Sequence, residues 1–425
     1  FTLENGLNVL VIPNHRAPVI TQMVWYRVGA ADEKPGESGL AHYLEHMMFK
    51  GSESVSPGEF SKRVKALGGQ DNAFTGQDFT AYFQSVSLDG LEEVMKMESD
   101  RMRGLLLPPE EIKSERLVVI EERRQRTEND PRAYFGEQLT ATLFMNHPYS
   151  NPIVGWLSEV DALNEDKLRG FYEKHYGPNN AWLIVSGDMT AEKFRPLAEK
   201  YYGDIPPLGV VPDRNWTKVP PFYAETHLTL HHKDIQQASI RKIYRVPGLR
   251  QNREASAALE VLENILDGGS ATRLYQRLVV EKKVAVSVTA SYYGTRWSDG
   301  IFTVSSIPAD GVSLKELEEA LDAELLDVIE NGVTVKEVTE AKSRLKDYAI
   351  FARDSLRGPA MAFGQAVTTG GTIEDVEYWP YRIDSVAVED IQKFAAEYLN
   401  PDMFGSRPPV VGYILPETEQ TGQTP

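Results

Sequence analysis

The sequence predicts an α+β fold made of two homologous domains in tandem. Its 425 residues exceed the roughly 100–200 that one domain usually holds. The same order of strand-like and helix-like segments occurs twice, and prolines gather between the two copies. Because each copy opens with strands and continues with runs of helices, layered α+β domains are favoured over strictly alternating βαβ units.

In the first half, β-branched and aromatic runs predict strands, and longer helical patterns follow them. The expected strands are Leu7–Ile12, Gln22–Val28, Thr80–Val86 and Ala181–Ser186. The expected helices are a segment from about Ser38, Pro57–Leu67, Leu88–Leu106, Pro109–Glu128 and Glu165–Tyr176.

The second half repeats this order. Its expected strands are Thr226–Leu230, Ser239–Val246, Val284–Tyr293, Ile301–Ser306 and Val410–Leu415. Its expected helices are Glu254–Leu266, Leu314–Glu330, Val335–Arg353 and Glu389–Leu399. Residues Asp166, Leu168, Phe171 and Pro178 match Glu389, Ile391, Phe394 and Pro401 at one offset of 223 positions. Together with the repeated order of elements, these matches at the ends of the two halves indicate duplication of a whole domain.

Domain boundaries follow from the proline-rich stretch at 206–221, which is typical of a semi-rigid, extended linker. We predict an N-terminal domain at 1–209, a linker at about 210–221 and a C-terminal domain at 222–425.

Composition excludes several classes of protein. The formal net charge of −17 argues against nucleic-acid binding, which needs a basic face. The chain has no cysteine, so neither disulfides nor cysteine metal sites are possible. Apolar runs stay far below the roughly 18–20 residues of a membrane span. A soluble protein with two sizeable cores is expected.

The stretch that carries chemistry is His-x-x-Glu-His at His42–His46, on an apolar helical pattern. Residues four apart share a helix face, so His42 and His46 can reach one ion. Two imidazoles and one carboxylate suit Zn²⁺ with one position left for water. Glu45, between the histidines, would then accept the water proton as a general base. The alternative is a pair of buried, hydrogen-bonded histidines.

A third ligand is expected on the acidic helix at 115–122. Glu115 and Glu122 lie two turns apart on one face, whereas Glu121 points about 100° away from Glu122. Spacing alone leaves the ligand open between Glu122 and Glu121. Glu115 is the candidate for orienting a histidine from the second sphere of the metal. The neighbouring Leu117–Ile120 suggests burial, and a buried carboxylate favours a nearby cation.

With these motifs in view, the chain resembles the pitrilysin family of inverted-motif zinc peptidases, and within it the small bacterial subfamily similar to the mitochondrial processing peptidase β subunit. The resemblance covers nearly the whole chain. It is carried by Asn5–Leu7, Gly39–Gly51, Gly68–Thr75, Asp100–Met102, Glu115–Glu122 and Gly268–Leu274. The family's third ligand follows the second histidine by about 76 residues, which selects Glu122, and its second acidic position falls on Glu115.

The resemblance also implies an architecture and a substrate. Family members form clamshells, of which this chain would be half, and extended peptides add as a strand near the metal. The edge segment would be Asn72, Ala73, Phe74 and Thr75. Without the resemblance, Gly68–Thr75 would be interpreted as a turn that leads into a strand. Main-chain pairing of this kind binds peptides with loose side-chain preference.

Two departures from the family pattern shape the expected assembly. The second half has no histidine in Glu260–Leu266, so one zinc per chain is the maximum. Val279 and Val286 stand where active members carry an arginine and a tyrosine that hold the substrate carbonyl. We therefore expect a heterodimer with a homologous partner that lacks the metal motif and supplies this pair; a homodimer is the alternative.

A function other than catalysis is also open, because some relatives are scaffolds like the core subunits of respiratory complexes, and a zinc-containing peptide-binding subunit would fit as well.

The chain begins at Phe1 in a strand-like segment, so removal of a signal peptide and a bacterial periplasmic location are expected, with the cytoplasm as the alternative.

Overall fold

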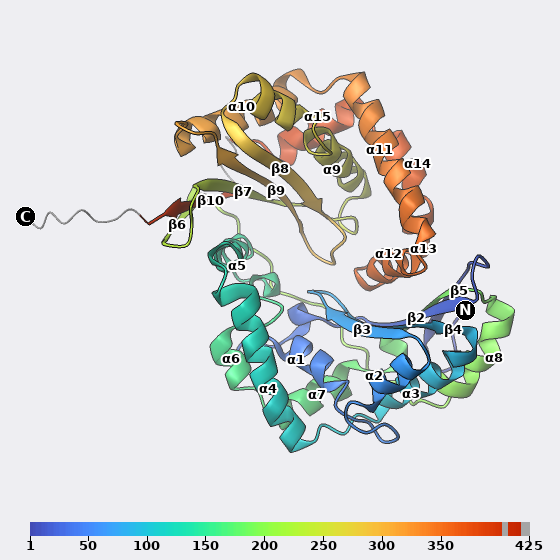
Figure 1. Ribbon diagram of the computed structural model, residues 1–425. Helices are drawn as coiled ribbons and strands as arrows, with labels where there is room; N and C mark the ends of the chain where they lie inside the picture. The colour runs from blue at the N-terminus through green and yellow to red at the C-terminus, as the bar shows by residue number, and fades with distance from the viewer. Residues whose placement is uncertain (402–406, 418–425) are drawn as a thin grey trace, which may run out of the picture. The chain divides into compact units, whose positions relative to one another are not determined.

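The computed structural model describes residues 1–401 and 407–417, apart from the side chains of 352–354. Two compact units make up this part of the chain (Figure 1). The first comprises Phe1–Gln125, His147–Thr217 and Phe351–Ile373. The second comprises Arg126–Asn146, Lys218–Ile350 and the segment from Glu374 onward. The chain passes from one unit to the other within the expected linker, and each unit also takes one segment from the other half of the sequence. The domain limits at 209 and 222 stay a prediction.

The first unit is built on a five-stranded sheet in the order β1-β5-β2-β4-β3. The strands are β1 (Asn8–Pro13), β2 (Val19–Tyr26), β3 (Gln70–Thr75), β4 (Thr80–Ser87) and β5 (Ala181–Gly187). The pair β1–β5 is parallel and the other pairs are antiparallel. Within the described residues, strand β3 pairs only with β4, so it forms one edge of the sheet.

The second unit repeats this topology in the order β6-β10-β7-β9-β8. Its strands are β6 (Thr226–His232), β7 (Ser239–Val246), β8 (Ala285–Tyr293), β9 (Gly300–Pro308) and β10 (Val410–Pro416). Here too the first and last strands in sequence pair in parallel, and the rest are antiparallel. Identical strand order in the two units confirms the predicted α+β fold of two homologous domains.

One face of each sheet is covered by helices of its own half. In the first unit these are α1 (Leu40–Met47), α2 (Glu59–Ala66), α3 (Leu91–Arg103), α4 (Pro109–Arg123), α6 (Leu157–Asp161), α7 (Glu165–His175) and α8 (Ala191–Tyr202). The second unit has α9 (Arg253–Leu266), α10 (Leu314–Asn331), α13 (Ile373–Glu377), α14 (Trp379–Ser385) and α15 (Val388–Tyr398). Helix α11 (Val335–Asp354) follows α10. Each group buries the main hydrophobic core of its unit.

The opposite faces are covered by helices from the other half of the sequence. Helix α12 (Arg357–Thr368) packs on β2 and β5, and α5 (Pro131–Leu143) packs on β10 and β7. Both contacts need a glycine. A Cβ on Gly364 of α12 would stand 2.0 Å from Trp25, and one on Gly412 of β10 would stand 2.6 Å from Phe135 of α5. These two helices were absent from the sequence-based expectation.

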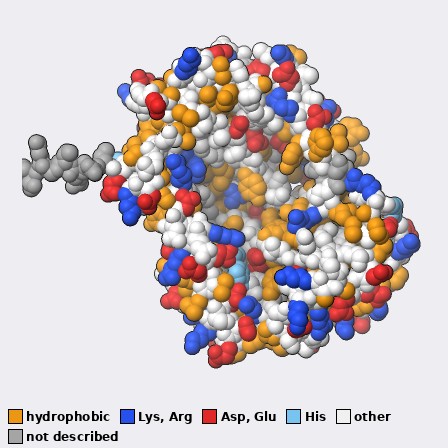
Figure 2. Space-filling view, viewed as in Figure 1, with side chains coloured by type: hydrophobic (Ala, Val, Ile, Leu, Met, Phe, Trp, Pro, Cys, Tyr) orange, Lys and Arg blue, Asp and Glu red, His pale blue; other side chains and the backbone are white. Residues whose placement is uncertain are grey.

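Helices α6, α8, α13 and α14 were not expected from the sequence either. The helix expected at 88–106 begins later, at Leu91, because Leu88–Gly90 is a 3-10 turn, and it ends at Arg103. The helix expected at 109–128 ends earlier, at Arg123, because Arg124–Glu128 is a π turn. No helix among the described residues has the length and apolarity needed to cross a bilayer. Acidic and basic side chains are interspersed over the face of the described chain seen in Figure 2.

Candidate metal centre

Helix α1 places the motif, and its start is fixed by a buried acid. Gly39 precedes the helix with a φ of 86°, and a Cβ there would lie 2.8 Å from the Val154 carbonyl oxygen. The Glu33 carboxylate accepts hydrogen bonds from the Gly39 and Ala41 N–H groups at 3.0 and 2.7 Å. These donors are among those that a helix leaves unpaired at its first turn. Helix α1 is thus held in place at the end where His42 begins its ligand face.

The structure brings His42, His46 and Glu122 together. The Nε2 atom of His42 lies 3.6 Å from Glu122 Oε2, and His46 Nε2 lies 3.1 Å from the same oxygen. One ligand atom from each residue lies within 4.8 Å of the other two. His42 is buried, and the side chains of His46 and Glu122 are less than one-fifth exposed. The cluster joins α1 to α4, as the helical-face argument predicts.

These residues fit a zinc ion by geometry and chemistry. Zn–N and Zn–O bonds of about 2.0–2.2 Å in a tetrahedron put ligand atoms about 3.3 Å apart. The two histidine–glutamate separations of 3.1 and 3.6 Å bracket that spacing. Two imidazoles and one carboxylate also leave the fourth position open, as in catalytic rather than structural zinc sites.

Glu115 contacts His46 from behind. Its Oε1 atom lies 2.8 Å from His46 Nδ1, and its Oε2 atom lies 2.6 Å from Lys50 Nζ. A carboxylate on the second ring nitrogen directs the first nitrogen toward a metal. Glu121 is more than half exposed, with its carboxylate 3.7 Å from Arg124. The structure therefore separates the two acids that spacing alone left open and favours Glu122.

Protonation follows from these contacts. Burial disfavours the His46 imidazolium, but hydrogen bonds with Glu115 and Glu122 outweigh burial and raise the pKa of His46 to about 9. Hydrogen bonds with His42 and His46 hold the pKa of Glu122 well below its usual range. The cluster thus stabilises positive charge, and a metal ion would displace protons from it.

Glu45 lies on α1 between the two histidines and has a contact that the sequence did not suggest. Its Oε2 atom accepts a hydrogen bond of 2.6 Å from the Thr75 hydroxyl at the end of β3. Thr75 was expected only as part of a peptide-binding edge. The hydroxyl can restrict the Glu45 rotamer, so β3 touches the candidate base as well as forming the sheet edge.

The sequence also did not predict the pairing of Lys50 with Glu115, although Lys50 follows His46 by four residues, just after the end of α1. Glu33 was missed for a different reason, because its contact with α1 runs from an irregular loop whose path no periodicity indicates. Asn72, Ala73 and Phe74 lie on the edge strand β3 as expected, and their role toward a peptide stays a prediction.

In the second unit, Val279 lies in a π-helical turn and Val286 lies on the edge strand β8, half exposed. The neighbouring arginines have acidic partners: Arg273 lies 2.6 Å from Asp327, and Arg277 lies 2.6 Å from the same carboxylate. These arginines are therefore engaged in ion pairs within their own unit.

Tandem α+β domains with a two-histidine, one-glutamate cluster on one of them are typical of a class of metallopeptidases, and comparisons with known proteins specify the family. A family model described as insulinase (peptidase family M16) matches residues 8–155, and one described as the M16 inactive domain matches 162–345. The chain belongs to the M16 peptidases, also called the pitrilysin family, and is of the small bacterial type.

Individual relatives agree. The zinc protease PqqE of Helicobacter pylori is 29% identical over 93% of this chain and 89% of its own. A crystal structure of a protease from Helicobacter pylori matches with a TM-score of 0.90 and 26% identity, covering 98% of both chains. The periplasmic protease PqqL of Escherichia coli shares the fold at 20% identity, with a TM-score of 0.82, and this chain covers 48% of it.

Proposed function

We propose that this protein is a zinc-dependent endopeptidase acting on extended peptides. The observation that carries the proposal is the convergence of His42, His46 and Glu122 at separations that suit one tetrahedral ion. Relatives named as zinc proteases over nearly the full length add to it. One zinc ion per chain is proposed, because the other unit has no histidine at the corresponding helix.

In this proposal, His42, His46 and Glu122 hold the ion and Glu115 orients His46. Bound zinc would supply Lewis acidity to a water molecule and to the scissile carbonyl. Glu45 accepts the proton of the attacking water and then delivers it to the leaving amine. Thr75, which donates to Glu45 from the end of β3, would hold that carboxylate in place until it takes the proton.

The substrate segment would be bound by main-chain pairing. Strand β3 has one edge that no other described strand pairs with, and it contacts α1. A peptide added to this edge forms backbone hydrogen bonds that do not depend on its side chains. Asn72, Ala73, Phe74 and Thr75 would form the pairing edge and bring the peptide bond toward Glu45.

We further propose that a homologous partner chain completes the site. Valine at 279 and 286 cannot donate a hydrogen bond to a substrate carbonyl, and the nearby arginines are paired with acids. The fold neighbour PqqL is about twice as long as this chain, so a second chain of similar size would complete a comparable assembly. A heterodimer with a subunit that carries Arg and Tyr is favoured, with a homodimer as the alternative.

The test combines metal analysis with cleavage of an internally quenched peptide library. We expect one bound zinc per chain, cleavage that a chelator abolishes, and a large rise in rate when the homologous partner is added. Full activity of the isolated monomer would reject the partner. Zinc binding without turnover, even with the partner present, would favour the alternative of a peptide-binding subunit. Absence of both would favour a scaffold. A periplasmic location remains our proposal, with the cytoplasm as the alternative.

A further inference from the structure

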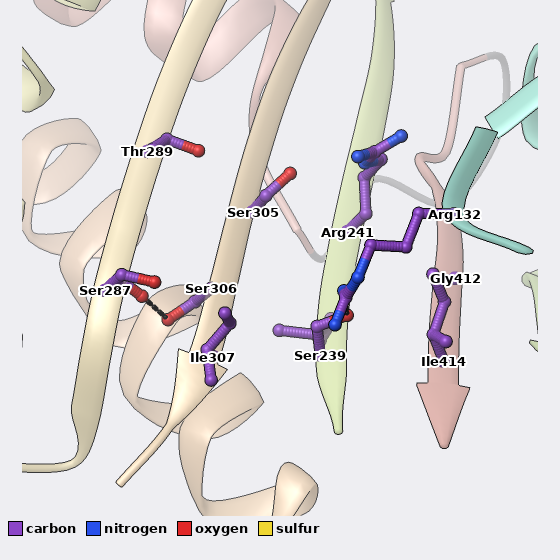
Figure 3. A pocket seen from close by; sticks show the side chains of 11 residues that line it. Arg132, Ser239, Arg241, Ser287, Thr289, Ser305, Ser306, Ile307, Gly412 and Ile414 are labelled. Carbon is purple, nitrogen blue, oxygen red and sulfur yellow. Dashed lines mark hydrogen bonds between the residues drawn. The ribbon is translucent and has the colours of Figure 1, made fainter. Parts of the chain in front are cut away.

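A pocket in the second unit shares no residue with the candidate metal centre and is unused by the proposed chemistry. Its volume is about 160 Å³, and it lies between the first turn of α5 and the strands β7, β8, β9 and β10 (Figure 3). All of its lining residues belong to this one unit.

The lining is rich in hydrogen-bond donors. Two guanidinium groups, of Arg132 and Arg241, are accompanied by hydroxyl side chains that include Ser239, Thr289 and Ser305. No aspartate or glutamate is among the residues that line the pocket within the described chain. Arg132 Nη1 donates a hydrogen bond of 3.1 Å to Ser239 Oγ, which directs its guanidinium over β7.

Arg241 differs from the other cations of its own strand. Lys242 has Glu318 and Asp322 as partners, and Arg245 lies 3.7 Å from Asp299. Arg241 makes no ion pair with a carboxylate in the described chain, and the charged group that affects it most is the positive Arg132. Two cations facing one pocket without an acid leave that pocket with a net positive potential.

Packing holds Arg241 in this position. A Cβ on Gly136 of α5 would stand 3.1 Å from Arg241 Nη1, so the glycine allows the helix backbone to lie against the guanidinium. Arg241 is only partly exposed, and burial together with Arg132 lowers its pKa. Desolvation of a cation without a counter-charge costs free energy. An anion in the pocket would offset this cost.

We propose that this pocket binds an oxyanion, either phosphate or the carboxylate of a peptide or small acid. The two guanidinium groups would supply charge-assisted hydrogen bonds, for which arginine is well suited. The serine and threonine hydroxyls would complete the shell of donors. The site is independent of zinc and of the proposed peptidase reaction, since it uses none of their residues.

Inorganic phosphate is the first probe, titrated into chelator-treated full-length protein at constant ionic strength with chloride as the reference anion. We expect saturable binding, and Arg241→Gln or Arg132→Gln should weaken it about tenfold or more, the usual loss for a hydrogen bond to a charged group. Lys315→Gln removes an equal charge from an 85% exposed position on α10 and should leave binding unchanged. Equal affinity in all three variants would overturn the proposal.

Thermal unfolding provides a readout that a purely structural arginine would not give. Without phosphate, Arg241→Gln relieves the repulsion between two cations, so its melting temperature should equal or exceed that of the wild type. With phosphate, the wild type should gain stability and the variant should not. A variant that melts lower in chloride and still responds fully to phosphate would contradict the anion site.

A third set of titrations distinguishes the sources of the oxyanion. Acetate, and a short peptide with a free or an amidated C-terminus, are added to the Glu45→Gln protein, which is chosen so that the peptide is not cleaved. Preference for the free acid over the amide identifies a peptide carboxylate, and binding of phosphate alone identifies a phosphate group. Binding of none of these probes would overturn the inference, whatever the outcome for the peptidase.

Discussion

Replacing Glu115 by glutamine tests whether the acid behind His46 supports metal binding. The substitution keeps an oxygen that can accept the hydrogen bond from His46 Nδ1, now 2.8 Å long, but removes its negative charge. Side-chain volume hardly changes, and the site is buried enough that solvent screens the charge poorly, since Glu115 is 6% exposed. The change therefore acts on the charge.

The size of the effect follows from the type of hydrogen bond. A charge-assisted hydrogen bond is roughly twice as strong as a neutral one, and net contributions are about 1.5–3 against 0.5–1.5 kcal/mol. The difference of about 1–1.5 kcal/mol corresponds to roughly tenfold weaker zinc binding. Tenfold is the upper value, because proton competition at His46 also decreases when the Glu115 charge no longer raises the pKa of His46.

Zinc affinity would be measured by competition with a fluorescent chelator at pH 7. The control is Glu111→Gln, which removes a carboxylate from the same helix. The Glu111 carboxylate lies 3.9 Å from Lys50 Nζ, the lysine that also pairs with Glu115, and Glu111 does not contact His46. We expect about tenfold weaker binding for Glu115→Gln and little change for Glu111→Gln. Equal affinities would refute the role assigned to Glu115.

Three further predictions concern the base, the pH dependence and the exchanged helix. Glu45→Gln should retain zinc, by the same competition assay, but lose about 10²–10⁴-fold in peptide turnover, and a turnover near wild type would exclude Glu45 as the base. Burial lowers the pKa of His175 to about 3, below its unfolded value of about 6.5, so the unfolded state binds the extra proton in between. The free energy of unfolding should thus fall as pH drops below 6.5, approaching about 1.4 kcal/mol per pH unit well below that value. In urea unfolding at several pH values, His175→Gln should show a pH dependence that is smaller by this amount. Gly364→Ala forces a methyl group into Trp25 and should cost about 1–3 kcal/mol in denaturant unfolding. The control Gly170→Ala, an exposed helical glycine with free space around it, should instead gain about 0.5–1 kcal/mol, and equal effects would rule out the close packing.

Much of the candidate site could be predicted because its parts depend on local helix geometry. His42 and His46 share a face of α1 by spacing alone, and Glu115 and Glu122 share a face of α4 by the same rule. The choice of Glu122 over Glu121 needed either the family resemblance or the structure, because helical period does not say which face of α4 meets α1. The Thr75–Glu45 contact joins residues 30 positions apart on different elements, and no periodicity reports it.

The fold was predictable wherever strands and helices have clear patterns, and two of the missed helices, α5 and α12, show why other parts were not. Helix α5 contains Gly136, and α12 contains Gly358, Pro359 and Gly364, residues that disfavour helix in isolation. In the structure, a Cβ at Gly364 would collide with Trp25, and Gly136 lets the α5 backbone lie close to Arg241. Packing thus outweighs local propensity at positions where the sequence signal points away from a helix.

The reciprocal placement of α5 and α12 has a consequence for how the molecule can be divided. Cutting the chain between residues 210 and 221 would give two fragments, each missing the helix that covers one face of its own sheet. The first would leave Trp25 and Phe83 uncovered, and the second would leave the β10 surface around Gly412 bare. Neither fragment should therefore fold stably by itself, and we expect the two units to fold together as one uncut chain.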